Sequence, residues 1–194
     1  YKSSIKDIDL NEVKAGIKLQ LLTYMNEMCK QESAEPAGAF YYNLIEPMVK
    51  ASQNMSDEQI EEELRKQFKM RGLILADVDI IRKMDKNLDT GSSNIIPATI
   101  NKDETLSKKA SNISKQQFEY LQKYTNKIIK QISEEILSGN INIKPYYNTK
   151  NKKTPCEYCT YKSICQFENG ICKKEYNYIS NLEKETILEM MKEK

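Results

Sequence analysis

The feature that most constrains this chain is a loop near its C-terminal end with three cysteines at C-x2-C-x5-C spacing. Cys156, Cys159 and Cys165 lie between Pro155 and Phe167, with aromatic residues among and after them. Two thiolates separated by two residues can turn toward one metal, and a third can close the site from the next turn of chain. A structural zinc or an iron–sulfur cluster usually takes four cysteine or histidine ligands, so this loop predicts a site that needs one more.

The two other cysteines differ from this group. Cys172 can be read as a fourth thiolate for a local zinc site, but we favour a surface or half-buried thiol. Cys29 falls among apolar residues of a predicted helix, and we expect a small core residue there. Because the sequence shows no signal peptide, its clustered cysteines indicate metal binding in a reducing compartment and not disulfide pairing.

The composition excludes several classes of function. The chain has 194 residues and a formal net charge of +2, which argues against a nucleic-acid-coating tail but allows a local basic patch. It has no histidine and no tryptophan, so catalysis that depends on histidine is excluded. Hydrolysis would need carboxylates, lysine and a metal-bound water. The longest apolar runs are only a few residues, which predicts no membrane span and a cytoplasmic protein.

The hydrophobic periodicity predicts a chain of long helices and short strands. Asp9 or Asn11 is expected to cap the first helix, and Gly139 to end the fourth. We predict a mobile loop at 86–103, because asparagine, aspartate, glycine, serine and proline are frequent there. Helices are expected at about 9–31, 56–68, 78–84, 114–137 and from 181, and strands at 39–45, 72–76 and 141–143.

Several short motifs occur in one order along the chain. Tyr-Lys-Ser-Ser at residues 1–4 is followed by Gln-Leu-Leu-Thr-Tyr at 20–24, Pro-Ala-Gly-Ala at 36–39, Gly-Leu-Ile-Leu-Ala-Asp at 72–77, and the cysteine loop. In this order they resemble the C-terminal nuclease domain of the AddB family, the second subunits of bacterial AddAB helicase–exonucleases. The resemblance covers essentially the whole chain.

This resemblance implies a mixed α/β (α+β) fold with a partial restriction-endonuclease-like, PD-(D/E)XK nuclease core, long helices and a C-terminal cysteine-rich loop. Residues 1–145 would form a partial RecB-type nuclease domain without its N-terminal strands. Residues 146–194 would form the cluster-binding segment and a C-terminal helix.

The same resemblance implies catalytic roles for three residues. Lys2 would be the active-site lysine beside a carboxylate that holds Mg²⁺, and Gln20 and Tyr24 would steady the metal–water network and the DNA backbone. Without the family, Lys2 is an ordinary exposed lysine, and Gln20 and Tyr24 form a helix face packed on a sheet. Because Tyr1 begins one residue after the expected aspartate, we expect the sequence as given to be inactive by itself.

In the family, a fourth cysteine far upstream joins three cysteines equivalent to Cys156, Cys159 and Cys165 around a [4Fe–4S] cluster. The resemblance also implies a heterodimer with the AddA helicase–nuclease subunit. That complex acts on single- and double-stranded DNA in the bacterial cytoplasm, degrading the 5′-ended strand during double-strand-break repair and recombination. In this sequence both Mg²⁺ and the cluster would be absent or incompletely held.

A second class of function also fits the residues. The loop with Lys150, Lys152 and Lys153 lies beside two tyrosines and can follow a DNA backbone, although lysine-rich loops are often only solvated. The chain would then be a non-catalytic scaffold, stapled by zinc or an iron–sulfur cluster, that binds DNA or a partner subunit. Asp77, Asp79 and Asp85 resemble metal ligands, but we interpret them as helix caps and solvated acids.

Overall fold

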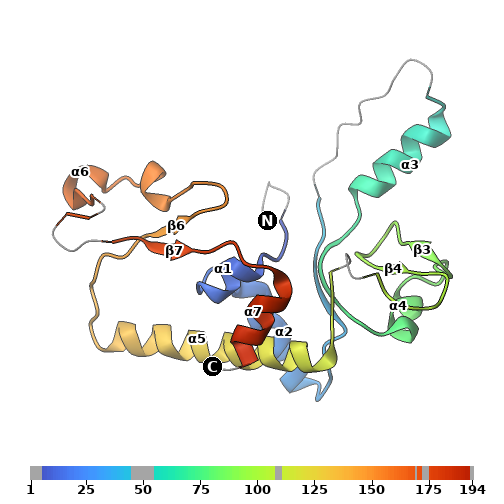
Figure 1. Ribbon diagram of the computed structural model, residues 1–194, viewed down its shortest axis with the longest axis horizontal. Helices are drawn as coiled ribbons and strands as arrows, with labels where there is room; N and C mark the ends of the chain where they lie inside the picture. Colours follow the sequence, from blue (N-terminus) through green and yellow to red (C-terminus); the bar gives the residue numbers. More distant parts are fainter. Residues whose placement is uncertain (1–5, 45–54, 108–110, 169, 172–174, 193–194) are drawn as a thin grey trace. The chain divides into compact units, whose positions relative to one another are not determined.

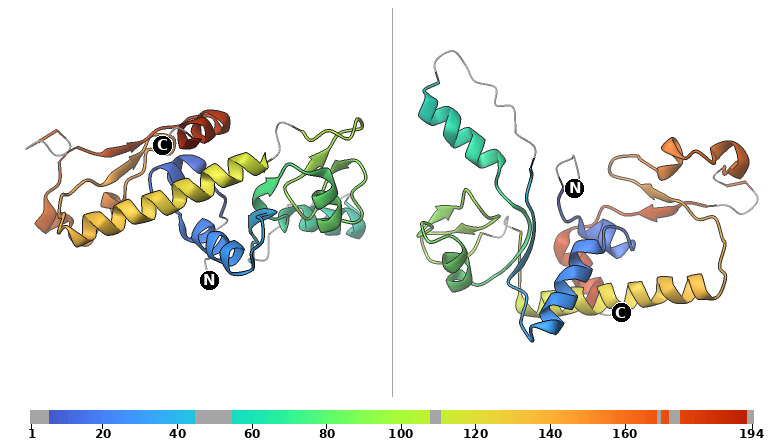
Figure 2. Two further views of the ribbon diagram at one scale, coloured as in Figure 1. Left: turned by 90° about the horizontal axis from the view of Figure 1, so that it is seen from below. Right: turned by 180° about the vertical axis from the view of Figure 1, so that it is seen from behind.

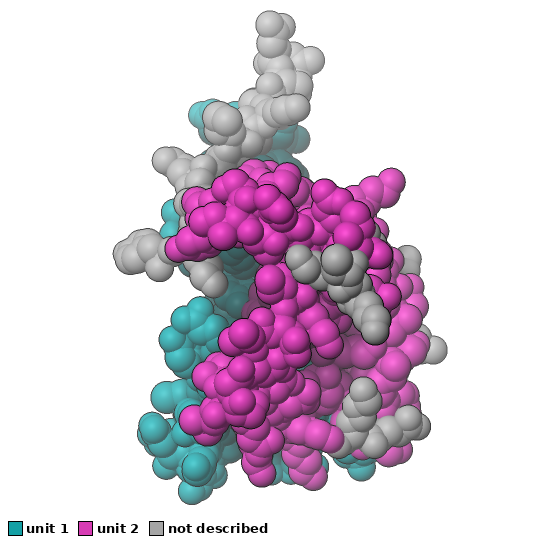
Figure 3. Space-filling model, turned by 90° about the vertical axis from the view of Figure 1, so that its left-hand side faces the viewer, with its two compact units in different colours: residues 1–8, 20–122 teal, residues 9–19, 123–194 magenta. Residues whose placement is uncertain are grey.

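The computed structural model describes residues 6–44, 55–107, 111–168, 170–171 and 175–192. The chain divides into two compact units, drawn in different colours in Figure 3. Unit 1 comprises residues 1–8 and 20–122, and unit 2 comprises residues 9–19 and 123–194. Lys2 and Cys172 lie outside the described residues. The mixed α/β class is confirmed, whereas the domain boundary at residue 145 stays a prediction.

Unit 1 is built on a mixed sheet with the strand order β1-β2-β5 (Figure 1). Strand β1 (Gly38–Tyr41) is antiparallel to β2 (Arg71–Leu75), and β2 is parallel to β5 (Asn112–Ile113). The predicted strand at 72–76 is confirmed. The strand predicted at 39–45 is shorter in the structure because Tyr41 pairs with Arg71, the first residue of β2, so the partner strand ends there.

Residues 86–103 contribute to the core of unit 1, which differs from the mobile loop that their composition predicted. They contain a short hairpin of β3 (Gly91–Ser92) and β4 (Thr99–Ile100). Figure 2 shows the hairpin beside α4 (Val78–Met84). Apolar residues scattered through a polar sequence drive this folding, because each is removed from water against β2 and α4. The core cluster consists of Ile74, Ile81, Leu88, Ile96, Ala98 and Ile100.

Local signals position the short helices of unit 1. Helix α3 (Asp57–Gln67) begins at a capping box, in which Ser56 Oγ accepts from the Gln59 N–H and Gln59 Oε1 accepts from the Ser56 N–H. Helix α4 begins at Asp77, whose carboxylate accepts from the Ile80 N–H at 3.1 Å. Both helices lie where the sequence predicts them.

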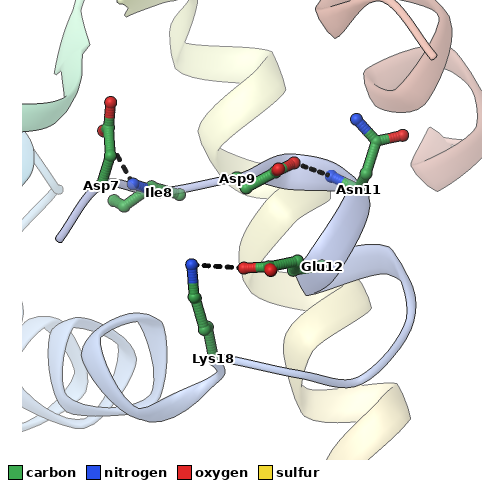
Figure 4. Close-up of polar contacts among 6 residues, drawn as sticks. All are labelled: Asp7, Ile8, Asp9, Asn11, Glu12 and Lys18. Atoms are coloured by element: carbon green, nitrogen blue, oxygen red, sulfur yellow. Dashed lines mark hydrogen bonds and ion pairs between the residues drawn. The ribbon is translucent and has the colours of Figure 1, made fainter. Parts of the chain in front are cut away.

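The helix predicted at 9–31 is two helices, α1 (Leu10–Lys14) and α2 (Gln20–Gln31). The connection contains Gly16 at φ +79° and Lys18 at φ +57°, which are left-handed conformations that an α-helix cannot contain. Lys18 forms an ion pair with Glu12, which closes this turn (Figure 4). The apolar periodicity continues through the connection and therefore hides the break.

Asp9 caps α1, and its carboxylate accepts from the Asn11 N–H at 2.9 Å (Figure 4). Asn11 has a different role from the predicted cap. Its amide exchanges two hydrogen bonds with the backbone of Leu182, donating at 3.2 Å and accepting at 2.9 Å. Helix α1 also contacts α7 (Lys184–Lys192), so the two sequence segments of unit 2 are joined here.

Helix α5 (Lys115–Leu137) begins in unit 1 and continues into unit 2. Its range agrees with the prediction, and Gly139 follows it in a left-handed conformation. The predicted apolar stripe is covered only in the first half. Phe118 and Leu121 are fully buried, whereas Ile132 is 41% and Ile136 71% exposed.

The strand predicted at 141–143 is absent from the described residues, and Ile141 is 92% exposed. The parallel pair of unit 2 is instead β6 (Tyr146–Asn148) and β7 (Asn177–Ile179), and β7 was not predicted. The 3-10 helix η1 (Pro155–Tyr158) and α6 (Lys162–Cys165) lie between these strands in sequence. No helix in the described ranges combines the length and apolarity needed to cross a bilayer.

Candidate functional site

The three predicted cysteine ligands line one cavity of unit 2, with a volume of about 390 Å³. Thr154 caps η1, and its hydroxyl accepts from the Cys156 N–H at 3.4 Å. The Cys159 N–H donates to the Cys156 carbonyl in the tight turn that the C-x2-C spacing predicts. Helix α6 then carries Cys165 back to the same cavity. The spacing therefore brings all three thiols to one space.

The donor set of this cavity fits a soft metal or an iron–sulfur cluster. Cys156, Cys159 and Cys165 are free thiols, and thiolates are the ligands that zinc and such clusters prefer. Within the described part of the chain, however, no three His, Cys, Asp or Glu side chains are close enough together to hold one metal ion. The identity of any bound group therefore stays a prediction.

Two aromatic residues that the sequence reading missed also line the cysteine cavity. Phe167 and Tyr176 have ring centroids 5.0 Å apart, and both contribute to its wall. Phe167 follows Cys165 by two residues, a signal that is visible in the sequence. Tyr176 reaches the cavity only because β7 pairs with β6, and pairing of two distant segments leaves no local signal.

Gln20 and Tyr24 form a pair on the first turns of α2. Gln20 Nε2 donates to the Tyr24 hydroxyl at 2.9 Å, and both side chains are exposed. Their four-residue spacing puts them on one helix face, as predicted. The idea that Gln20 is buried and packed on the sheet is wrong. Because Lys2 lies outside the described residues, its approach to this pair stays a prediction.

The acidic residues that resembled metal ligands have structural roles. Asp77 caps α4 as expected, and Asp79 is exposed in the first turn of that helix. Asp85 differs from a solvated acid because it is only 6% exposed. Its Oδ2 accepts from the Ser93 hydroxyl at 2.6 Å, and its Oδ1 accepts from the Asn87 N–H at 3.2 Å.

The predicted basic loop follows β6 in unit 2. Lys150, Lys152 and Lys153 are all exposed, and Asn148 Oδ1 orders the turn by accepting from the Lys150 N–H at 3.0 Å. Tyr147, one of the two tyrosines beside this loop, packs at 5.3 Å against Tyr176, so its ring is partly covered. The loop presents charge with less aromatic surface than the sequence suggests.

Cys29 is half-buried on α2, so it is less enclosed than the predicted core residue. It lies in unit 1, whereas the three clustered cysteines lie in unit 2.

Comparison with known proteins places these features in a family. A family model described as the PD-(D/E)XK nuclease superfamily matches residues 1–166, which include α2, the sheet of unit 1 and the cysteine loop. This chain belongs to the PD-(D/E)XK nuclease superfamily. Members of this superfamily typically depend on a divalent metal.

Curated relatives narrow the position of the chain within the PD-(D/E)XK superfamily. It is similar to the AddB subunit of the ATP-dependent helicase/deoxyribonuclease from Thermoanaerobacter sp. (strain X514), at 40% identity over 98% of this chain. It is also similar to the proteins of that name from Bacillus thuringiensis (strain Al Hakam), at 39% over 100% of the chain, and from Acetivibrio thermocellus, at 38% over 98%. The chain spans about 17% of the length of each of these relatives.

Proposed function

We propose that this chain is the nuclease part of the AddB subunit of an ATP-dependent helicase/deoxyribonuclease. In the complete AddAB complex of the bacterial cytoplasm, it would hydrolyse phosphodiester bonds of unwound single-stranded DNA in the 5′-to-3′ direction. This exonuclease activity would serve double-strand-break repair and recombination. The observation that carries the proposal is the superfamily match over residues 1–166, supported by relatives of about 40% identity along nearly the whole chain.

In the proposed mechanism, bound Mg²⁺ activates water and neutralises charge that develops on the phosphate. Lys2 contributes a positive charge beside the scissile phosphate and orients the attacking water. The Gln20–Tyr24 pair supports this role, because its hydrogen bond fixes an amide and a hydroxyl on the exposed face of α2. These groups hold the DNA backbone and the water network in place.

We further propose that Cys156, Cys159 and Cys165 hold a [4Fe–4S] cluster with a fourth cysteine from elsewhere in the longer polypeptide. Support comes from the three free thiols on one cavity and from the aromatic wall of Phe167 and Tyr176, which limits water near the sulfurs. A cluster would tie the cysteine loop to a distant part of that polypeptide.

Substitution of the proposed active-site lysine tests the nuclease proposal. In the full-length protein assembled with its AddA partner, Lys2→Ala should lower cleavage of the 5′-ended strand by about 100-fold or more, because a donor to the developing charge is lost. Cleavage of an end-labelled duplex with ATP and Mg²⁺ measures this. Lys6→Ala, four residues along the same segment, is the matched control and should cleave at the parental rate. Parental cleavage by Lys2→Ala would remove Lys2 from the mechanism.

The cluster proposal has its own test in the full-length protein purified without oxygen. The parental protein should be brown and contain about four irons per chain, as a [4Fe–4S] centre requires. Cys159→Ser should lose most of the iron and the visible absorption, whereas Cys29→Ser should keep both because Cys29 lies in the other unit. Colourless parental protein with one zinc per chain would support a local zinc site instead.

A second candidate function rests on the exposed basic loop in the same unit as the cysteine cavity. In this alternative the chain is a cysteine-stapled scaffold that binds DNA or a partner protein without cleaving DNA. It predicts DNA binding that does not depend on Mg²⁺ and that weakens when Lys150, Lys152 and Lys153 are changed together to glutamate. It also predicts that Lys2→Ala leaves cleavage by the complex unchanged.

A further inference from the structure

Unit 1 contains a second cavity, with a volume of about 560 Å³, that the proposed nuclease residues do not line. Its walls come from Tyr42 after β1, from Arg65 and Phe68 at the end of α3, and from the loop between Asp85 and Ile95. All of these segments belong to one compact unit. The volume falls within the range of pockets that take small organic molecules, and it admits one nucleotide.

One side of this cavity is an aromatic wall. The rings of Tyr42 and Phe68 lie nearly parallel, with an interplanar angle of 18° and centroids 6.2 Å apart. Tyr42 is nevertheless 54% exposed, so much of its ring remains open to solvent at the cavity. An open aromatic face next to a cavity is the element on which single-stranded nucleic acids stack their bases.

The opposite side of the cavity is polar and carries a fixed carboxylate. Asp85 is held by the Ser93 hydroxyl and the Asn87 N–H, so its position is set before any ligand arrives. Thr90, Ser92 and Asn94 add hydroxyl and amide groups. A carboxylate here disfavours a phosphate in the interior and favours a neutral group that offers hydrogen-bond donors. A nucleobase meets that requirement.

Arg65 supplies positive charge to the same cavity. Its partner is Glu61, one turn earlier on α3, and both side chains are well exposed. An exposed pair of this kind contributes little free energy, so a phosphate can displace Glu61 from the guanidinium at small cost. The cavity therefore combines a stacking surface, hydrogen-bonding groups and a phosphate ligand within the span of one nucleotide.

We propose that this cavity binds one nucleotide of single-stranded DNA, with its base stacked on Tyr42 and its phosphate on Arg65. The inference rests on the proposed nuclease function, because such a site would hold the strand on unit 1 while cleavage proceeds elsewhere. It adds a binding site to that function and assigns no catalytic role to these residues.

Binding of a fluorescein-labelled 12-nucleotide oligothymidylate to the 194-residue chain tests the stacking surface, with EDTA present to prevent cleavage. Tyr42→Ala should weaken binding by about five- to tenfold, because base–aromatic stacking is lost. Tyr42→Trp should restore binding, which separates stacking from a folding defect, and circular dichroism confirms the fold of each variant. A 12-base-pair duplex should bind both variants equally, since its bases already stack on one another.

The salt dependence of the same binding tests the phosphate contact. Arg65→Ala should reduce the slope of log K against log salt by about 0.7, the value for one phosphate contact on a single strand. Arg82→Ala is the matched control, because Arg82 also forms an exposed ion pair in unit 1, with Glu104, but does not line the cavity. Equal slopes for Arg65→Ala and the parent, or equal losses for both arginine variants, would overturn the assignment.

Crosslinking in the complete complex locates the nucleotide directly. An oligonucleotide that carries 5-bromodeoxyuridine should crosslink on irradiation to Tyr42 or Phe68, whereas crosslinks confined to residues 146–153 would overturn the proposal. The two proposals fail separately. Loss of cleavage in Lys2→Ala with unchanged binding in Tyr42→Ala removes the cavity alone, and the reverse result removes the catalytic proposal alone.

Discussion

Gly72 shows how closely two strands of unit 1 approach each other at a single residue. It lies on β2 opposite Phe40 of β1, at φ +143°, and a Cβ atom there would meet the Ala39 carbonyl oxygen at 2.1 Å. Because that contact is with backbone, a side chain cannot turn aside to relieve it. Glycine is therefore required for the pairing that places Tyr41, and next to it Tyr42, at the end of β1.

We expect Gly72→Ala to lower the free energy of unfolding by about 2–4 kcal/mol, because backbone strain is added to a displaced strand. Gly91→Ala is the matched control. Gly91 also has a positive φ, +93°, but a Cβ atom added there would meet nothing within 4 Å, so about 1 kcal/mol of strain is expected. Urea denaturation followed by circular dichroism measures both values. Equal losses in the two variants would mean that the approach of the strands is not the cause.

At the scale of elements, α5 has two halves that the same periodic sequence does not distinguish. Phe118 and Leu121 are enclosed in the first half, whereas the isoleucines of the last turns project into solvent in the described structure. Apolar spacing predicts that a helix has one apolar face, but it does not state how far along the helix a partner covers that face.

This difference predicts unequal effects of truncation along α5. Phe118→Ala should cost about 3–5 kcal/mol of unfolding free energy, since a buried ring is replaced by a cavity. Ile136→Ala on the same helix should change it by less than about 0.5 kcal/mol, because its side chain is already exposed. Thermal unfolding of both variants of the 194-residue chain checks the prediction. A large loss in Ile136→Ala would show that this half of α5 is covered in solution.

At the scale of the whole molecule, contacts between distant segments define unit 2. Asn11 binds Leu182, and the Tyr124 hydroxyl donates to the Lys14 carbonyl at 2.8 Å. Burial raises the pKa of Tyr124, because the ionised phenolate would lie in a poorly hydrated place. The neutral phenol that donates this hydrogen bond is therefore favoured in the folded chain.

The raised pKa of Tyr124 predicts how stability changes at high pH. In the unfolded chain this tyrosine loses its proton at about pH 10, whereas the folded chain keeps it to a higher pH. Between these two values the unfolded state binds fewer protons, so the free energy of unfolding should fall as the pH rises above about 10. Tyr124→Phe should reduce this fall and cost about 1 kcal/mol at neutral pH through the lost hydrogen bond.

Urea denaturation at a series of pH values measures the effect of Tyr124. Tyr178→Phe serves as a comparison, because Tyr178 is about half exposed and should leave the alkaline slope as in the parent. An unchanged slope in Tyr124→Phe would contradict the role assigned to this hydroxyl.

The sequence by itself determined the features that depend on near neighbours. The caps at Ser56 and Asp77, the long helix that ends before Gly139, and the turn that brings three cysteine thiols to one cavity all follow from spacings of a few residues. Backbone geometry fixes such spacings whatever the rest of the chain does. The order of the short motifs along the chain likewise indicated the nuclease superfamily.

Only the tertiary structure decided which of these residues are covered and by what. It broke the first helix at Gly16 and Lys18, drew polar residues 86–103 into the core and paired β6 with β7. It also assembled the cavity of Tyr42, Arg65 and Asp85 from three separate segments. The physical reason is that burial is a property of pairs of surfaces, and the second surface comes from residues far away in the chain.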